Sequence, residues 1–419
     1  MALPWPDYPD RMSSLRPLDQ SRKLKDVLYE IRGEALVEAD RLEAEGHTIL
    51  KLNTGNPAVF GFDAPFQIVR DMIDAIPSAH GYSESKGIMS ARRAVVYRYE
   101  QEPGFPTFTP DDVYLGNGVS ELITMTMQAL LDEGDEVLIP APDYPLWTAM
   151  TSLGGGTPVH YVCDEQNGWQ PDIEDIRSKI TDRTKAIVVI NPNNPTGAVY
   201  TREVLTQIVE LAREHSLLLL ADEIYDRILF DGARHIPLAT LAPDLLCLTF
   251  NGLSKTYRVA GYRSGWMVIT GPRHHARGFL EGINLLASTR LCPNVPAQHA
   301  VQAALSGVQS IDALIAPTGR LHEQRDAAWE GLEAIPGVSC VKPAGALYAF
   351  PRLDPEVHEI RDDAKLVHDL LVAEHILLVP GTGFNWPTPD HLRIVTLPEA
   401  RVIAEAIERL GNFLSSYRQ

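Results

Sequence analysis

The 419-residue sequence has few cysteines, a shortage of basic residues and no long apolar run. Its four cysteines form no CxxC pair, which excludes zinc ribbons and thioredoxin-like redox sites. Lys and Arg number 37 against 55 Asp and Glu, and the resulting net charge of −18 disfavours nucleic-acid binding. No apolar run approaches the length of a membrane span, and residues 1–14 lack the apolar core of a signal peptide. We therefore expect a cytoplasmic protein with neither nucleic acid nor membrane as partner.

Motifs of several enzyme classes are also missing. The 13 histidines form no HExxH and no HxH spacing near carboxylates, so the sequence predicts no metal site. A GxSxG nucleophile motif is absent, which leaves no basis for a Ser-His-Asp triad.

The central part of the chain alternates short apolar runs with amphipathic stretches such as Glu121–Leu131 and Thr201–His215. Strands that are apolar on both faces and separated by helices predict a mostly parallel sheet covered by helices. An all-helical protein with short apolar helices is the alternative. The predicted strands are Val113–Leu115, Glu136–Pro140, Pro158–Val162, Ala186–Asn191, Leu217–Asp222, Leu246–Phe250 and Trp266–Thr270.

After about residue 275 the pattern changes and predicts a smaller α+β domain. We expect an N-terminal arm that joins this smaller domain over residues 1–65, a large domain over 66–296 and the rest of the small domain over 297–419. The predicted elements are a long helical region at Ala297–Ala334, a hairpin around Val338–Phe350, a helix at Asp362–Glu374, strands at Ile376–Val379 and Leu392–Thr396, and a helix at Pro398–Ser416.

The loop after the predicted strand Leu246–Phe250 brings together the hydroxyl of Ser254, the amine of Lys255 and the guanidinium of Arg263. A lysine becomes a nucleophile where burial and neighbouring cations lower its pKa. From this residue alone, a solvated surface lysine remains the alternative.

Residues 115–121, Leu-Gly-Asn-Gly-Val-Ser-Glu, link a strand to a helix, whose first N–H groups can bind an anion. This segment lacks the last glycine of GxGxxG, and by itself it favours a plain strand–helix turn.

Two charged residues lie in apolar surroundings. Asp222 ends an apolar run, where an unpaired carboxylate is costly to bury, so we expect a cationic partner unless it caps a following helix. Arg393 is flanked by apolar residues and could hold a carboxylate through two parallel hydrogen bonds, or form a salt bridge on an edge strand. Tyr144, by itself, could be a core residue.

The segments Asn191–Gly197, Ala221–Tyr225 and Ser254–Trp266, in this order, resemble the class I aminotransferases, which use pyridoxal 5′-phosphate (PLP). The resemblance extends from about Ser21 to the C-terminus. It implies a large PLP-binding domain with a mostly parallel seven-stranded sheet between helices, a smaller α+β domain, and a homodimer. Gly252 stands where the family pattern has a serine, which leaves the lysine assignment intact.

The resemblance also implies the roles of individual residues. Lys255 would bind PLP covalently and move the substrate proton, Asp222 would face the pyridine nitrogen, and Tyr225 would contact the phenolic oxygen. The other implied contacts are Val119, Ser120, Ser254 and Arg263 to the phosphate, Tyr82 to the phosphate from the neighbouring subunit, Tyr144 to the ring, Asn194 to PLP and substrate, Gly55 beside the substrate, and Arg393 to the substrate carboxylate.

Three N-terminal segments, Ser21–Gly33, Leu50–Pro57 and Phe60–Phe62, are similar to bacterial glutamate–pyruvate (alanine) aminotransferases. This similarity implies amino transfer between L-alanine and 2-oxoglutarate, with Tyr29 and Arg32 at the substrate mouth. An N-terminal extension, Thr54 and Val59 depart from that pattern. Aspartate, aromatic or branched-chain aminotransferases and a PLP β-lyase are the enzyme alternatives. A PLP-binding regulatory module is disfavoured by the short preceding segment and the negative charge.

Overall fold

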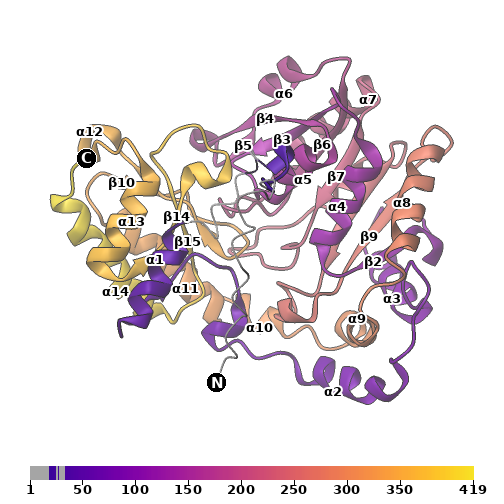
Figure 1. The fold of residues 1–419 in the computed structure, drawn as a ribbon, viewed down its shortest axis with the longest axis horizontal. Helices are drawn as coiled ribbons and strands as arrows, with labels where there is room; N and C mark the ends of the chain where they lie inside the picture. The colour runs from indigo at the N-terminus through magenta and orange to yellow at the C-terminus, as the bar shows by residue number, and fades with distance from the viewer. Residues whose placement is uncertain (1–17, 25–26, 28–33) are drawn as a thin grey trace, which may run out of the picture.

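A computed structural model describes residues 18–24, 27 and 34–419, which form a larger and a smaller lobe (Figure 1). The larger lobe contains an eight-stranded sheet of order β2-β9-β8-β7-β6-β3-β4-β5. Strands β3, β4, β6, β7 and β8 run parallel, and β9 is antiparallel to both β8 and β2. The strands are β2 (Val113–Gly116), β3 (Glu136–Ala141), β4 (Thr157–Asp164), β5 (Gln170–Pro171), β6 (Thr184–Ile190), β7 (Leu218–Asp222), β8 (Cys247–Gly252) and β9 (Gly265–Thr270).

All seven predicted strands form, and the mostly parallel sheet is confirmed. The additional strand, β5, has only two residues and pairs antiparallel with β4 at the edge of the sheet. A two-residue strand is too short to show an apolar pattern, so the sequence did not indicate it.

The central strands are apolar on both faces because helices cover both faces. In β6, Ala186, Val188 and Ile190 pack in one apolar core, and the alternate residues Ile187 and Val189 pack in another. The first core includes helices α4 (Val119–Leu130), α5 (Leu146–Gly154) and α8 (Arg277–Thr289), and the second includes α6 (Ile173–Lys179) and α7 (Arg202–Glu214). The all-helical alternative is excluded. Thr201 caps the start of α7, since its hydroxyl accepts a hydrogen bond of 3.3 Å from the Val204 N–H.

A further group of helices covers the end of the sheet formed by β2 and β9. Their apolar side chains pack with Val113, Leu115, Trp266 and Val268 of those two strands. The helices are α2 (Phe66–Ala75), α3 (Met89–Glu100) and α9 (Val295–Ser306).

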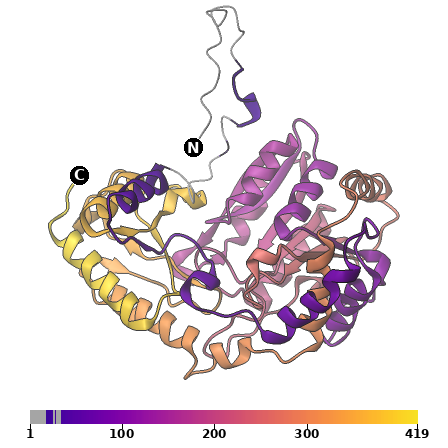
Figure 2. The same cartoon turned by 60° about the horizontal axis from the view of Figure 1, so that its bottom comes forward.

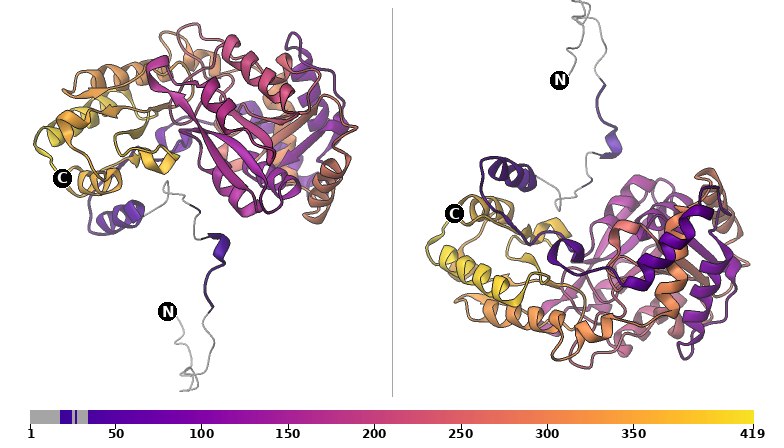
Figure 3. Two further views of the ribbon diagram at one scale, coloured as in Figure 1. Left: turned by 90° about the horizontal axis from the view of Figure 1, so that it is seen from above. Right: turned by 90° about the horizontal axis from the view of Figure 1, so that it is seen from below.

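The smaller lobe combines N-terminal and C-terminal segments around one apolar core. Leu42 and Leu52 pack in the same core as Leu332, Leu371 and Leu410. Figures 2 and 3 show the N-terminal helix beside the C-terminal helices of this lobe. The helices are α1 (Glu34–Ala44), α11 (Arg320–Glu333), α13 (Asp363–Glu374) and α14 (Ala400–Ser416).

Short strands line the side of the smaller lobe that faces the larger one. Strand β1 (Leu50–Lys51) pairs parallel with β13 (Ile376–Leu377). A three-stranded sheet has the order β11-β15-β14, with β15 (Leu392–Val395) between β11 (Tyr348–Ala349) and β14 (Val379–Pro380). Strand β15 carries Arg393, and the segment that follows β1 carries Gly55.

Two predictions for the C-terminal part were wrong in detail. The long helical region at Ala297–Ala334 is divided into α9, α10 (Ile311–Ile315) and α11, with glycine and proline in the breaks. The hairpin around Val338–Phe350 does not form, because β10 (Val338–Ser339) pairs with β12 (Arg352–Leu353) and β11 pairs with β15.

The predicted domain boundary at 296/297 falls inside α9, which packs on the larger lobe, so we propose a boundary after that helix. The boundary at 65/66 stays a prediction.

Candidate active site

A cavity of about 510 Å³ lies where the two lobes meet, at the carboxyl ends of the parallel strands. Loops that follow neighbouring parallel strands open at the same edge of a sheet, which is where α/β folds place their ligands. The cavity is lined by the predicted residues Gly55, Val119, Ser120, Tyr144, Asn194, Asp222, Tyr225, Ser254, Lys255, Arg263 and Arg393.

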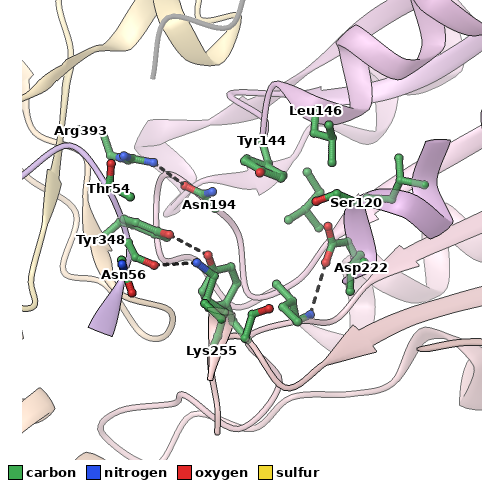
Figure 4. Close-up of a pocket in the computed structure, with 18 of the residues that line it drawn as sticks. Thr54, Asn56, Ser120, Tyr144, Leu146, Asn194, Asp222, Lys255, Tyr348 and Arg393 are labelled. Atoms are coloured by element: carbon green, nitrogen blue, oxygen red, sulfur yellow. Dashed lines mark hydrogen bonds between the residues drawn. The ribbon is translucent and has the colours of Figure 1, made fainter. Parts of the chain in front are cut away.

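Lys255 lies in the loop after β8, and its side chain crosses from the larger lobe toward the smaller one. Its Nζ donates a hydrogen bond of 2.7 Å to the carbonyl oxygen of Gly55, in the segment after β1 (Figure 4). The amine therefore points into the cavity, which excludes a solvated surface lysine.

Asp222 ends β7 and is only 3% exposed. Its carboxylate accepts a 3.0 Å hydrogen bond from Trp147 Nε1 and a 3.3 Å bond from the Ile224 N–H. Burial raises the pKa of Asp222 to about 6, although these two hydrogen bonds act in the opposite direction. The residues after it form turns and no helix, so the helix-cap alternative is excluded. None of the described residues forms an ion pair with it, so the site suits a cationic ligand atom.

Tyr225 and Tyr348 form a buried pair of phenols on the other side of Lys255. Their hydroxyl oxygens are 2.8 Å apart, and their rings meet edge to face. Burial and the neighbouring Tyr348 raise the pKa of Tyr225 well above its ordinary value. Burial would also raise the pKa of Tyr348, but the charges of Lys255 and Arg393 and the hydrogen bonds to Tyr225 and Lys255 lower it overall.

Sequence reasoning missed Tyr348. A tyrosine on a two-residue strand carries no local sign of function, and the predicted hairpin gave β11 the wrong partner. Only the pairing of β11 with β15 brings Tyr348 beside Arg393.

Arg393 lies on β15, the central strand of its sheet, and is 2% exposed. The edge-strand alternative is therefore excluded. Nη1 donates to Asn194 Oδ1 at 3.5 Å, Nη2 donates to the Asn53 carbonyl, and the guanidinium carbon lies 4.7 Å from the ring centroids of both Tyr348 and Phe384. A planar fork in this position can bind a carboxylate that enters the cavity.

The opposite end of the cavity has the donors for an anion. Helix α4 begins at Val119, and Gly118 before it has φ 82° and ψ 166°, a conformation that is essentially restricted to glycine. A Cβ at Gly118 would lie 2.3 Å from Arg263 Nη2, so the guanidinium packs directly on this turn. Ser120 and Ser254 also line this end. Backbone N–H groups at a helix start, two hydroxyls and one guanidinium make a cradle for a phosphate group.

Tyr144, in the loop after β3, is part of the cavity wall and not a core residue (Figure 4). The groups together suit a flat ligand with an anionic group, a basic ring nitrogen beside Asp222 and an electrophile near Lys255. No group of three His, Cys, Asp or Glu among the described residues could hold a metal ion.

One predicted residue in the described part of the chain does not line this cavity. Tyr82 lies before α3 and is 83% exposed, so a single chain does not bring it to the site. Tyr29 and Arg32 lie outside the described residues. The helices of the described part include none that is long and apolar enough to cross a bilayer.

Comparisons with known proteins agree with this geometry. The family described as aminotransferase class I and II matches residues 47–410. The chain is 72% identical to the alanine aminotransferase of Mycobacterium tuberculosis, over 100% of this chain and 97% of the relative. It is 60% identical to the glutamate-pyruvate aminotransferase AlaA of Escherichia coli, over 97% of this chain and 100% of the relative. A crystal structure of an aminotransferase from Escherichia coli superposes with a TM-score of 0.95 at 60% identity, covering 96% of this chain and 100% of that one.

Proposed function

The chain belongs to the class I and II aminotransferases, and on this premise we propose that it uses PLP to transfer the amino group of L-alanine to 2-oxoglutarate, giving pyruvate and L-glutamate. One observation carries the proposal: the Lys255 amine, the buried Asp222 carboxylate and the Arg393 guanidinium line one cavity. The two relatives with 72% and 60% identity bear names that specify alanine or glutamate and pyruvate.

The cavity residues fit PLP. Val119, Ser120, Ser254 and Arg263 would hold the phosphate in the cradle at the start of α4. Asp222 would pair with the ring nitrogen, which accounts for a buried carboxylate that forms no ion pair with a described residue and whose pKa is raised to about 6. Tyr225 and Asn194 would contact the phenolic oxygen, and Tyr144 would cover the ring. Bound PLP supplies an electron sink for the negative charge that develops at the substrate α-carbon.

The residues of the chain then have separate tasks. Arg393 binds the α-carboxylate of the amino acid through two parallel hydrogen bonds and so orients its α-carbon toward Lys255. Lys255 Nζ removes the proton from that carbon and later returns a proton, acting as general base and then as general acid. The Gly55 carbonyl, 2.7 Å from Nζ, holds the amine within the cavity.

The test is a panel of amino donors mixed singly with the PLP-loaded enzyme, with the absorption change and the released keto acid as readouts. We expect alanine and glutamate to react and pyruvate and 2-oxoglutarate to reverse the change. Lys255→Ala serves as the control and should lose turnover while remaining folded, because one amine carries the proton transfer. A preference for aspartate, aromatic or branched-chain donors with no response to alanine would contradict the substrate assignment and leave the family intact.

We also propose that the working unit is a homodimer in the cytoplasm. Exposed apolar side chains on α2 and just after it, Phe66, Ile73 and Ile76, and Leu285 on α8 support an interface. Tyr82, the residue expected to reach the phosphate of the neighbouring site, is itself exposed. The four cysteines are free thiols, which supports a reducing compartment.

A further inference from the structure

Tyr348 lies between two groups of the proposed active site, and neither the motifs nor the family comparison assigns it a function. It is 3% exposed, and the pairing of β11 with β15 sets it opposite Val395, two residues from Arg393. One part of its side chain faces the proposed carboxylate-binding group, and the other faces the proposed proton-transfer group (Figure 4).

The ring of Tyr348 contacts Arg393. The guanidinium carbon lies 4.7 Å from the Tyr348 ring centroid and equally 4.7 Å from that of Phe384. Contacts with two aromatic rings stabilise the cation and restrict the rotation of its planar fork. Because bidentate binding of a carboxylate depends on the plane of the guanidinium, both rings help to set the substrate position.

The hydroxyl of Tyr348 faces a different set of groups. It lies 2.8 Å from Tyr225 Oη, and it sits so close to Gly55 that a Cβ there would be 2.2 Å from it. The carbonyl of the same Gly55 holds Lys255 Nζ at 2.7 Å, and the charge of Lys255 acts to lower the pKa of Tyr348. The charged and titratable groups around this hydroxyl are thus Lys255, Tyr225 and Arg393.

We infer that Tyr348 is a positioning residue with two separable functions: its ring orients Arg393 for the substrate carboxylate, and its hydroxyl orients Lys255 and Tyr225 for proton transfer. The inference rests on the proposed function. Because the two contacts use different atoms of one side chain, the hydroxyl contact can be removed while the ring contact to Arg393 remains. Tyr348→Phe removes only the hydroxyl, whereas Phe384→Leu removes an aromatic contact to Arg393 and leaves the hydroxyl in place.

The test compares these two variants as PLP-loaded enzymes. The first readout is the midpoint of the pH-dependent absorption change without substrate. The second is the Kd of propionate, which is alanine without its amino group. The third is kcat and KM for alanine.

For Tyr348→Phe we expect the midpoint to move to lower pH by about one unit, because the protonated Lys255 nitrogen loses a neighbouring hydroxyl oxygen. The effect should be that of losing one hydrogen bond to a charged group. Its kcat should fall about tenfold, with KM and the propionate Kd within about twofold of wild type. For Phe384→Leu we expect about a three- to tenfold rise in KM and in the propionate Kd, with an unchanged midpoint.

A wild-type midpoint and kcat in Tyr348→Phe would overturn the inference, as would equal effects of both variants on propionate binding. Tyr348→Leu removes both contacts of Tyr348 and must show both defects, and it also replaces Phe384→Leu if that variant does not fold. Wild-type enzyme that binds no PLP or does not react with alanine would instead contradict the proposed function, so the two failures are distinguishable.

Discussion

Asp222 illustrates at the scale of one residue how a fold prepares a site for a ligand. The carboxylate is enclosed at the end of β7 with two hydrogen bonds to neutral donors, and no described residue forms an ion pair with it. Such a group is destabilising on its own and becomes favourable when a cation binds. We expect this residue to matter more for reaction rate than for cofactor retention, since other residues, at the start of α4 and in the loop after β8, form the phosphate cradle.

Replacing Asp222 with Asn tests that expectation. The rate of amino transfer should fall about a hundredfold, on the order of 3 kcal/mol, because one charge interaction that stabilises the transition state is lost. The PLP content after purification should change little. Stopped-flow measurement of the alanine half-reaction, together with the absorbance of bound PLP, separates the two effects. Near-normal turnover would show that Asp222 does not serve the ring nitrogen.

The same substitution predicts a pH effect on the PLP-free protein. Burial raises the pKa of Asp222 from 3.8 to about 6 in the folded state, so the folded chain keeps this proton to higher pH than the unfolded chain. The stability of wild type relative to Asp222→Asn should therefore fall as pH rises from about 4 to about 6. The total change is on the order of 3 kcal/mol. Urea unfolding of both PLP-free proteins across this range measures it.

A second buried carboxyl group, that of Asp143, does not disturb that comparison. Burial raises its pKa to about 7, which affects stability in the same direction, but the residue is present in both proteins and its effect cancels in the difference. A stability difference that does not vary with pH would contradict the assigned protonation of Asp222.

At the scale of an element, the start of α4 combines a backbone conformation with a side-chain contact. Gly118 has φ 82°, and Arg263 packs where a Cβ would be. Arg263 also donates hydrogen bonds to the carbonyls of Ala260 and Asn117, so its position depends on the whole turn. The phosphate cradle is therefore a joint property of the β2–α4 and β8–β9 connections and not of a single side chain.

Gly118→Ala should raise the Kd for PLP at least tenfold, because the new methyl group displaces the Arg263 guanidinium and the backbone is strained. Gly104→Ala is the matched control, since Gly104 has a similar φ of 80° and no atom within 4 Å of a built Cβ. Fluorescence titration with PLP and thermal unfolding should show strain in both variants and weak PLP binding in one. Equal PLP affinity in both would contradict the placement of the cradle.

At the scale of the whole molecule, two features of the surface support the proposed homodimer. The apolar residues on α2 and the exposed Tyr82 belong to the larger lobe, and the cavity of the same chain does not include Tyr82. A twofold contact would complete two sites at once, because an isologous interface supplies each site with the same residue of the other subunit.

Subunit mixing tests the shared site. Lys255→Ala and Tyr82→Glu are each expected to be inactive, the second because a carboxylate repels the PLP phosphate. After the subunits exchange, a mixed dimer should contain one site with both defects and one with neither. Activity should then return to about a quarter of the wild-type value at random mixing. No recovery, or an active monomer in sedimentation at assay concentration, would reject the shared site.

The sequence alone determined the parts of the fold that depend on local patterns. The seven central strands are apolar on both faces, and their residues alternate between two helix-covered cores, so each strand is recognisable from its own residues. Lys255, Asp222, Asn194 and Tyr144 each lie at the end of one of those strands or in the loop that follows it, and Ser120 lies in the first turn of the helix after β2. Once the sheet is parallel, its geometry brings them to one edge.

Only the tertiary structure decided how the smaller lobe contributes. Its strands have two to four residues, too few for a pattern to select a partner, and the predicted hairpin around Val338–Phe350 was wrong for that reason. The pairing of β11 with β15 is set by burial against segments distant in the sequence, and it places Tyr348 between Arg393, Tyr225 and Lys255. The raised pKa of Asp222 likewise depends on what surrounds it, because desolvation is a property of the assembled core and not of a residue's neighbours in the chain.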